Sequence, residues 1–96
     1  MLVLVTYDVN TETDGGKKRL RQVAKFCVKY GQRVQNSVFE CVVDAATYRL
    51  MKHQLLSIID VKKDSLRFYN LGKNYKEKTE HYGIKLGIDM EGVIMI

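Results

Sequence analysis

The chain has 96 residues, of which 46% are hydrophobic and 28% charged, and it contains neither proline nor tryptophan. This length supports one domain with one small core, and no apolar run approaches the roughly 20 residues that cross a bilayer. We therefore expect a single domain over residues 1–96 with no membrane segment. A formal charge of +5 and a pI near 9.3 favour a polyanionic partner such as nucleic acid.

The first predicted strand spans residues 2–8 and ends in the carboxylate of Asp8. Six uncharged, mostly aliphatic residues precede that carboxylate, which is typical of a strand buried on both faces. Alternation along the strand places Asp8 on the same face as Leu4 and Thr6, where a charge is costly unless something uses it. Two interpretations stay equally open, a cap for the following turn and a functional carboxylate.

A polar loop with paired glycines, Gly15 and Gly16, leads into a predicted helix that runs to about Tyr30. Thr13 or Asp14 is expected as its N-cap and Gly31 as its C-terminal cap. The apolar positions of this helix repeat at i, i+3, i+4 and i+7, as in an amphipathic helix; they are Leu20, Val23, Ala24 and Cys27.

A basic stripe lies nearly opposite that apolar face and consists of Lys18, Arg21, Lys25 and Lys29. A solvated surface is the usual meaning of such a stripe, and contact with phosphates is the alternative. At the start of the helix, backbone N–H groups and the cations of Lys17, Lys18 and Arg19 would suit a phosphate. The P-loop pattern is absent from the sequence.

The middle of the chain predicts two strands and a helix. A short strand over residues 33–35 and a longer one over 38–43 meet at a bend at Asn36-Ser37, and Asp44 caps a helix over residues 45–59. That helix is expected to turn Tyr48, Met51, Leu55, Ile58 and Ile59 inward and Arg49, Lys52, His53 and Gln54 outward. Cys27 and Cys41 are interpreted as buried thiols, and His53 and His81 receive no role.

A fourth strand over residues 65–71 completes the order βαββαβ. We therefore predict an α+β, ferredoxin-like fold, with an antiparallel sheet and both helices on one face. The core covers residues 1–71, the connector 72–83, and an additional C-terminal strand segment 84–96. Because one face of the sheet stays uncovered, we expect a homodimer in which the C-terminal segment pairs across the interface. The N-terminus lacks the pattern of a signal peptide, so a cytoplasmic protein is expected.

Several motifs resemble those of one known family. They are Tyr7-Asp8 closing the first strand, Tyr30-Gly31 ending the basic helix, and the segment Arg33-Val34-Gln35-Asn36-Ser37-Val38-Phe39-Glu40. The chain is similar over its whole length to the small CRISPR-associated nuclease that partners the CRISPR integrase during spacer acquisition in antiviral defence.

The resemblance implies a homodimer in which Asp8 of each subunit is the catalytic, metal-associated residue, with Mg²⁺ or Mn²⁺ as cofactor. It implies an endonuclease acting on double-stranded DNA or single-stranded RNA, or, as in some members, only a DNA-binding scaffold for the integrase. The family's motif positions here are Tyr7, Asp8, Arg33, Gln35, Ser37 and Phe39, and Arg19 or Arg21 supplies a basic residue on the helix. The predicted nucleic-acid-binding set is thus Tyr7, Lys17, Lys18, Arg19, Arg21, Lys25, Arg33, Ser37 and Phe39.

The chemistry leaves the choice between enzyme and scaffold open. Hydrolysis of a phosphodiester needs a nucleophilic water and neutralisation of charge on the phosphoryl oxygens, which a carboxylate-bound Mg²⁺ supplies. A single carboxylate per chain offers few ligands to a metal ion. A two-fold axis beside the first strand would bring Asp8 and its symmetry mate together and so double their number. A scaffold needs only the basic residues. An RNA-recognition module shares the element order, but its aromatic motif is missing from the third strand.

Overall fold

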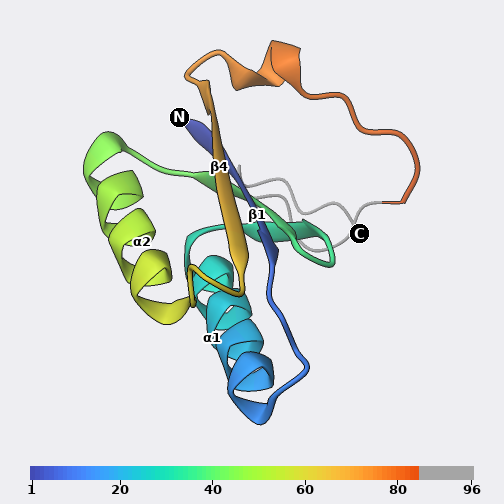
Figure 1. Ribbon diagram of the computed structural model, residues 1–96. Helices are drawn as coiled ribbons and strands as arrows, with labels where there is room; N and C mark the ends of the chain where they lie inside the picture. Colours follow the sequence, from blue (N-terminus) through green and yellow to red (C-terminus); the bar gives the residue numbers. More distant parts are fainter. Residues whose placement is uncertain (85–96) are drawn as a thin grey trace.

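The central strand β1 (Leu2–Asp8) organises the sheet of the computed structural model, which describes residues 1–84. It lies between β3 and β4 in a four-stranded sheet of order β2-β3-β1-β4 with antiparallel pairing throughout (Figure 1). The other elements are α1 (Asp14–Tyr30), β2 (Gln32–Gln35), β3 (Val38–Val42), α2 (Ala45–Ile58) and β4 (Ser65–Gly72). The predicted ferredoxin-like α+β order is confirmed.

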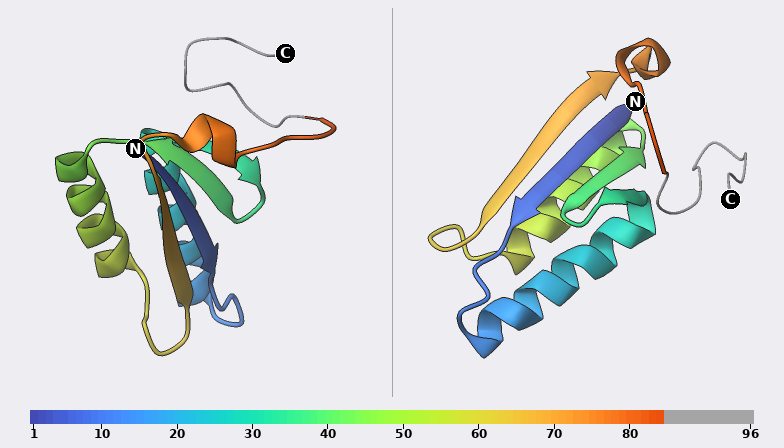
Figure 2. Two further views of the ribbon diagram at one scale, coloured as in Figure 1. Left: turned by 90° about the horizontal axis from the view of Figure 1, so that it is seen from above. Right: turned by 90° about the vertical axis from the view of Figure 1, so that its right-hand side faces the viewer.

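Both helices pack on one face of the sheet, as Figure 2 shows. Val23 and Cys27 of α1 and Met51 and Leu55 of α2 are fully buried against the sheet residues Val3, Val5, Phe39 and Cys41. Burial of these apolar side chains is the main force that holds the layers together. Cys27 and Cys41 are free, buried thiols, as predicted.

One residue of α2 differs from its predicted orientation. Gln54 was expected to point away from the apolar side, yet its Oε1 accepts a hydrogen bond of 2.6 Å from the hydroxyl of Tyr30 at the end of α1. The two helices are therefore joined by a polar contact as well as by apolar packing, because both residues lie on the sides where the helices meet.

The open face of the sheet is less apolar than the sequence suggested. Leu4 and Val38 contribute aliphatic surface, but β4 places Arg67 and Tyr69 on this face, and Tyr69 is 42% exposed. On this face β1 is aliphatic at Leu4 and polar at Thr6 and Asp8, and the exposed positions of β4 alternate with half-buried Leu66 and Phe68. The open face therefore combines an aliphatic centre with a polar border.

Gly31 ends α1 as predicted, but for a different reason. Its backbone is extended, with φ of −160°, so it is not the left-handed cap that usually requires glycine. A Cβ at this position would collide with the carbonyl oxygen of Glu40 and lie 2.6 Å from Sγ of Cys41. Gly31 is therefore needed for the close approach of α1 to β3.

The connector after β4 contains a short 3₁₀ helix, η1 (Tyr75–Lys78), which the sequence did not predict. The predicted C-terminal strand over residues 84–96 lies outside the described residues, apart from Ile84, which is 90% exposed. Within residues 1–84, none of the helices has the length and apolar character needed to cross a membrane.

Candidate active site at the end of the central strand

Asp8 is exposed at the last position of β1, directly opposite Ser65 of β4. It points to the open face of the sheet, because Val5 and Tyr7 are the side chains of β1 that pack toward the helices. No residue among 1–84 donates a hydrogen bond to its carboxylate. The following turn is capped by Asn10, whose Oδ1 accepts the N–H of Glu12 at 3.0 Å, so Asp8 is not a turn cap.

Asp8 lines an open surface cavity of about 510 Å³. Two loops form it, the loop from β1 to α1 and the turn from α2 to β4. Its lining residues are Asp8, Asn10, Thr11, Glu12, Lys62, Lys63, Asp64 and Ser65. The cavity combines carboxylates, hydroxyls and two cations, a composition suited to a cation together with an anionic ligand.

The Asp64 carboxylate fixes the two loops to each other. It accepts hydrogen bonds from the N–H groups of Asn10 (3.1 Å) and Asp60 (2.9 Å) and from Nε and Nη2 of Arg19 (2.8 and 3.2 Å). The side chain of Asp64 has no exposed surface, and the Arg19 guanidinium lowers its pKa to about 2. Arg19, predicted to contact nucleic acid, is thus engaged inside the protein.

The glycine pair at the start of α1 does not form the phosphate cradle that the sequence suggested. The Gly16 N–H donates to Oγ1 of Thr13 (3.1 Å) and the Lys17 N–H to the Thr13 carbonyl oxygen (3.1 Å), so both groups are already satisfied. Gly16 is buried, and a Cβ there would collide with the carbonyl oxygen of Asn10. The glycine therefore allows the loop to pack against the helix, and Thr13 is the N-cap, as predicted.

Tyr7, Phe39 and Arg33 form a stack on the helix side of the sheet. The rings of Tyr7 and Phe39 lie 6.2 Å apart, and the Arg33 guanidinium lies 5.2 Å from the Phe39 ring centroid. Tyr7 is 6% exposed and Phe39 0%, so burial raises the pKa of Tyr7 and removes Phe39 from the reach of a nucleic acid. Ser37 contacts this group through its carbonyl oxygen, which accepts the Tyr7 N–H at 3.1 Å. Arg33 remains exposed.

The basic stripe of α1 is exposed as predicted, including Lys18, Arg21, Lys25 and Lys29, and Lys17 is exposed beside it. Because Val23 and Cys27 of α1 face the sheet, the stripe faces away from it. Asp8 is on the opposite, open face. The structure therefore does not bring the stripe and the carboxylate together within one chain.

Two cations that line the Asp8 cavity, and a third on the same face of the sheet, were not among the predicted site residues. Lys62 and Lys63 line the cavity, and Arg67 is opposite Thr6, one step along the same face. Only the register of Asp8 against Ser65 shows that the turn before β4 adjoins Asp8. Pairing between strands so far apart in sequence is not encoded in a local pattern.

Among residues 1–84, no group of three or more histidine, cysteine, aspartate or glutamate side chains is placed to hold a metal ion. His53 is exposed, and Nε2 of His81 lies 2.9 Å from the carbonyl oxygen of Gly83, so neither joins Asp8. A single exposed carboxylate fits Mg²⁺ when phosphates, waters or a second subunit complete the ligands.

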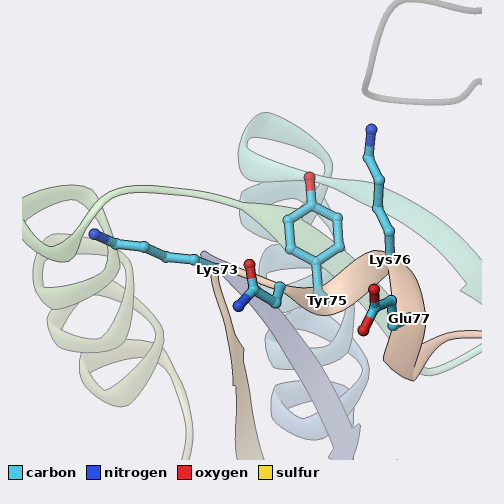
Figure 3. Close-up of a pocket in the computed structure, with 5 residues that line it drawn as sticks. Lys73, Tyr75, Lys76 and Glu77 are labelled. Carbon is cyan, nitrogen blue, oxygen red and sulfur yellow. The ribbon is translucent and has the colours of Figure 1, made fainter.

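A second cavity, of about 500 Å³, is formed by η1 and the residues before it. It lies beyond Gly72, at the opposite end of β4 from Ser65. Figure 3 shows the side chains of Lys73 and Lys76 extending in different directions on either side of Tyr75. The two lysines of this cavity therefore do not converge on a common point (Figure 3), and we do not treat it as the candidate site.

The fold and the site define a small ferredoxin-like α+β protein with one exposed carboxylate at the end of its central strand and a basic helix behind the sheet. The family model described as CRISPR associated protein Cas2 matches residues 1–79. The chain belongs to this Cas2 family.

Similar proteins carry names of the same family. The CRISPR-associated endonuclease Cas2 of Halalkalibacterium halodurans is 63% identical over 91 residues, which are 95% of each chain. The CRISPR-associated endoribonuclease Cas2 of Nitratidesulfovibrio vulgaris is 56% identical over 96 residues, covering 100% of this chain and 94% of the relative. The crystal structure of Streptococcus pyogenes Cas2 at pH 6.5 matches with a TM-score of 0.74 and 65% identity, covering 86% of this chain and 100% of that one.

Proposed function

We propose that the chain is a metal-dependent endonuclease of CRISPR adaptation, cleaving phosphodiester bonds during spacer acquisition in antiviral defence. The observation that carries the proposal is the exposed Asp8 carboxylate, which has no hydrogen-bond donor among residues 1–84 and opens into a cavity of about 510 Å³. A carboxylate without an internal partner is available to a cation. Relatives 63% and 56% identical are named endonuclease and endoribonuclease, which supports this class of reaction.

Asp8 would hold the divalent cation, Mg²⁺ or Mn²⁺. A cation bound there supplies charge neutralisation at the phosphoryl oxygens and lowers the pKa of a bound water. The chain's own contribution is position, since Asp8 is the last residue of β1 and the pairing with Ser65 fixes the backbone that carries the carboxylate. The hydrogen bonds of Asp64 to Asn10 and Asp60 keep both walls of the cavity in place.

A homodimer would double the number of carboxylates. The helices leave one face of the sheet uncovered, and Leu4, Val38 and the 38% exposed Val42 give that face its aliphatic part. Burying this surface against a second copy is favourable, and two-fold symmetry would place both Asp8 side chains at the same interface. The CRISPR integrase is the further partner in this proposal.

The substrate we propose first is double-stranded DNA, with single-stranded RNA as the alternative to be tested beside it. The exposed cations Lys17, Lys18, Arg21 and Lys25, with Arg33 at the edge of the sheet, suit the sugar–phosphate backbone of either nucleic acid. No element that would read base edges stands out among the described residues. Binding is therefore expected to tolerate any sequence.

A DNA-binding scaffold for the integrase is the second candidate, and one observation favours it. The basic stripe of α1 faces away from Asp8, so it can hold a duplex without the carboxylate. Such a protein would bind DNA with strong salt dependence and would cleave nothing.

The experiment compares wild type with Asp8→Asn, using Asp14→Asn as a control for removal of an exposed acid. Wild type and Asp14→Asn should cleave linear DNA or single-stranded RNA with Mg²⁺, and EDTA should stop them. Asp8→Asn should lose at least about 100-fold of the rate while its Tm is unchanged, because a neutral amide is a poor Mg²⁺ ligand. Cleavage that survives EDTA, or an Asp8→Asn variant as active as wild type, contradicts the metal mechanism. DNA binding without any cleavage by wild type supports the scaffold.

Two further measurements test the parts of the proposal that concern assembly and binding. Light scattering at micromolar concentration should give a dimer mass, and a monomer mass rejects the symmetric site. Substituting Lys18, Arg21 or Lys25 by Gln should lower the log–log salt slope of DNA binding by about one each. Unchanged slopes in all three would mean that the stripe is only a solvated surface.

A further inference from the structure

The turn between α2 and β4 supplies the cations of the Asp8 cavity. Lys62 and Lys63 line this cavity together with Asp8, whereas the basic stripe of α1 faces the other way. Ser65 is directly opposite Asp8 in the pairing of β1 with β4, so Lys63 is only two residues from the strand partner of the carboxylate. A lysine side chain spans that separation easily.

The backbone of this turn is fixed by its own hydrogen bonds. The N–H groups of Lys63 and Asp64 donate to the Asp60 carbonyl oxygen at 3.0 and 2.7 Å, and the Lys62 N–H donates to Asp60 Oδ1 at 2.9 Å. The Asp64 carboxylate closes the turn through the Asp60 N–H and ties it to Asn10 on the opposite wall. Both lysines are exposed, so flexible side chains extend from a positioned backbone.

The charges around the cavity leave these lysines available to an anion. Arg19 already pairs with Asp64, with Nε 2.8 Å from Oδ2, so that carboxylate does not need a lysine. A phosphodiester approaching Asp8 and Glu12, which are both exposed, would meet two negative charges, and like charges repel each other. Lys62 and Lys63 line the same cavity, and their positive charges would offset that repulsion.

Exposed lysines in turns are usually only solvated, so a second pair of exposed lysines in the same chain serves as a comparison. Lys73 and Lys76 line the cavity at η1, at the other end of β4, and their side chains extend apart in Figure 3. Neither of them is among the residues that line the Asp8 cavity. What distinguishes Lys62 and Lys63 is therefore their common cavity with the exposed carboxylate.

We propose that Lys62 and Lys63 bind the backbone phosphate of the nucleic acid that lies in the Asp8 cavity. This inference rests on the proposed function in one respect, that nucleic acid reaches Asp8. The ligand chemistry is the phosphodiester group shared by DNA and RNA. The two lysines are binding residues of the site, additional to those on α1.

The test measures binding without cleavage, in EDTA, with every variant made in the Asp8→Asn background. Lys62→Gln/Lys63→Gln is compared with the matched pair Lys73→Gln/Lys76→Gln, which removes the same charge elsewhere. The ligands are a fluorescent DNA duplex of arbitrary sequence and a single-stranded RNA, each titrated at several salt concentrations. The first variant should lower the log–log salt slope by about two and the affinity by about tenfold or more, and the control should change neither.

Three results would overturn the inference. They are an equal loss of affinity in both double variants, an unchanged affinity in Lys62→Gln/Lys63→Gln, and no measurable binding by the Asp8→Asn protein that carries neither pair of substitutions. A loss seen with only one of the two ligands would support the inference and identify that nucleic acid as the one in the cavity. Because the assay needs no turnover, it separates the two proposals. If wild type fails to cleave, the endonuclease proposal is rejected, but the binding result for Lys62 and Lys63 is unaffected. If wild type cleaves and Lys62→Gln/Lys63→Gln leaves the salt slope of binding unaltered, only the proposed lysine contacts are rejected. Unchanged melting temperatures show that each variant is folded.

Discussion

The Arg19 guanidinium and the Asp64 carboxylate join a helix to a turn across 45 residues of sequence, with Nε 2.8 Å from Oδ2 and Nη2 3.2 Å from Oδ1. The pair connects the first turn and a half of α1 to the turn before β4, next to the Asp8 cavity. A bidentate arrangement of this kind is among the stronger contacts available to charged side chains.

Asp64→Asn should destabilise the protein by roughly 2 kcal/mol near neutral pH, because buried donors lose a charged acceptor. The folded-state pKa of Asp64 is lowered to about 2. The carboxylate therefore contributes stability that is present above its unfolded pKa near 4 and is lost as the pH falls toward 2. In urea unfolding, the difference in the free energy of unfolding between wild type and Asp64→Asn should therefore become smaller as the pH falls over this range. Glu77→Gln, a substitution at an exposed residue, serves as the control. A difference in the free energy of unfolding between wild type and Asp64→Asn that does not change with pH contradicts the prediction.

The two neighbouring glycines at the start of α1 should respond in opposite ways to alanine. In Gly16→Ala the new Cβ collides with the backbone of Asn10, which should cost roughly 1–3 kcal/mol. In Gly15→Ala the nearest atoms are 3.7 and 3.8 Å away, so better helix propensity should stabilise by up to about 1 kcal/mol. The free energies of unfolding of both variants, measured by chemical denaturation, check this prediction. Similar values for Gly15→Ala and Gly16→Ala would contradict the close approach of the Asn10 backbone to Gly16.

Phe39 should act through packing and not through stacking on a base. Phe39→Ala should lose roughly 3–5 kcal/mol, whereas Phe39→Leu should lose about 1.5 kcal/mol or less, because it keeps most of the apolar volume. Folded Phe39→Leu should therefore bind a DNA duplex with the wild-type dissociation constant. A variant that melts like wild type yet binds tenfold more weakly would restore Phe39 as a contact residue.

The two thiols should be unreactive in the folded protein. Burial raises the pKa of Cys27 to about 12 and that of Cys41 to about 11, so the nucleophilic thiolate is scarce at pH 8. Labelling with an aromatic disulfide reagent should be slower than in denaturant by at least about 100-fold for both cysteines. Rapid modification of one thiol under native conditions would place it outside the core.

Local patterns were sufficient for the elements of this fold. The N-cap at Thr13 and the bend at Asn36-Ser37 were predictable because each depends on neighbours in sequence. The surroundings of Asp8 were not, since Asp64 meets Arg19 only after β4 pairs with β1 in one particular register. Alternation likewise divides a strand into two faces but does not say which face the helices cover. Phe39 was expected as a contact residue from the family resemblance alone, and it is fully buried on the helix side.

The pairing of β1 has a consequence for how the chain folds. β1 precedes both of its partners in the chain, which are β3, residues 38–42, and β4, residues 65–72. Contacts between segments so distant must overcome the entropy of closing long loops before they contribute stability, which slows folding relative to helical proteins of this size. Until β4 emerges from the ribosome, the most apolar strand keeps an unpaired edge, so the nascent chain is vulnerable to aggregation until the sheet can close on that side.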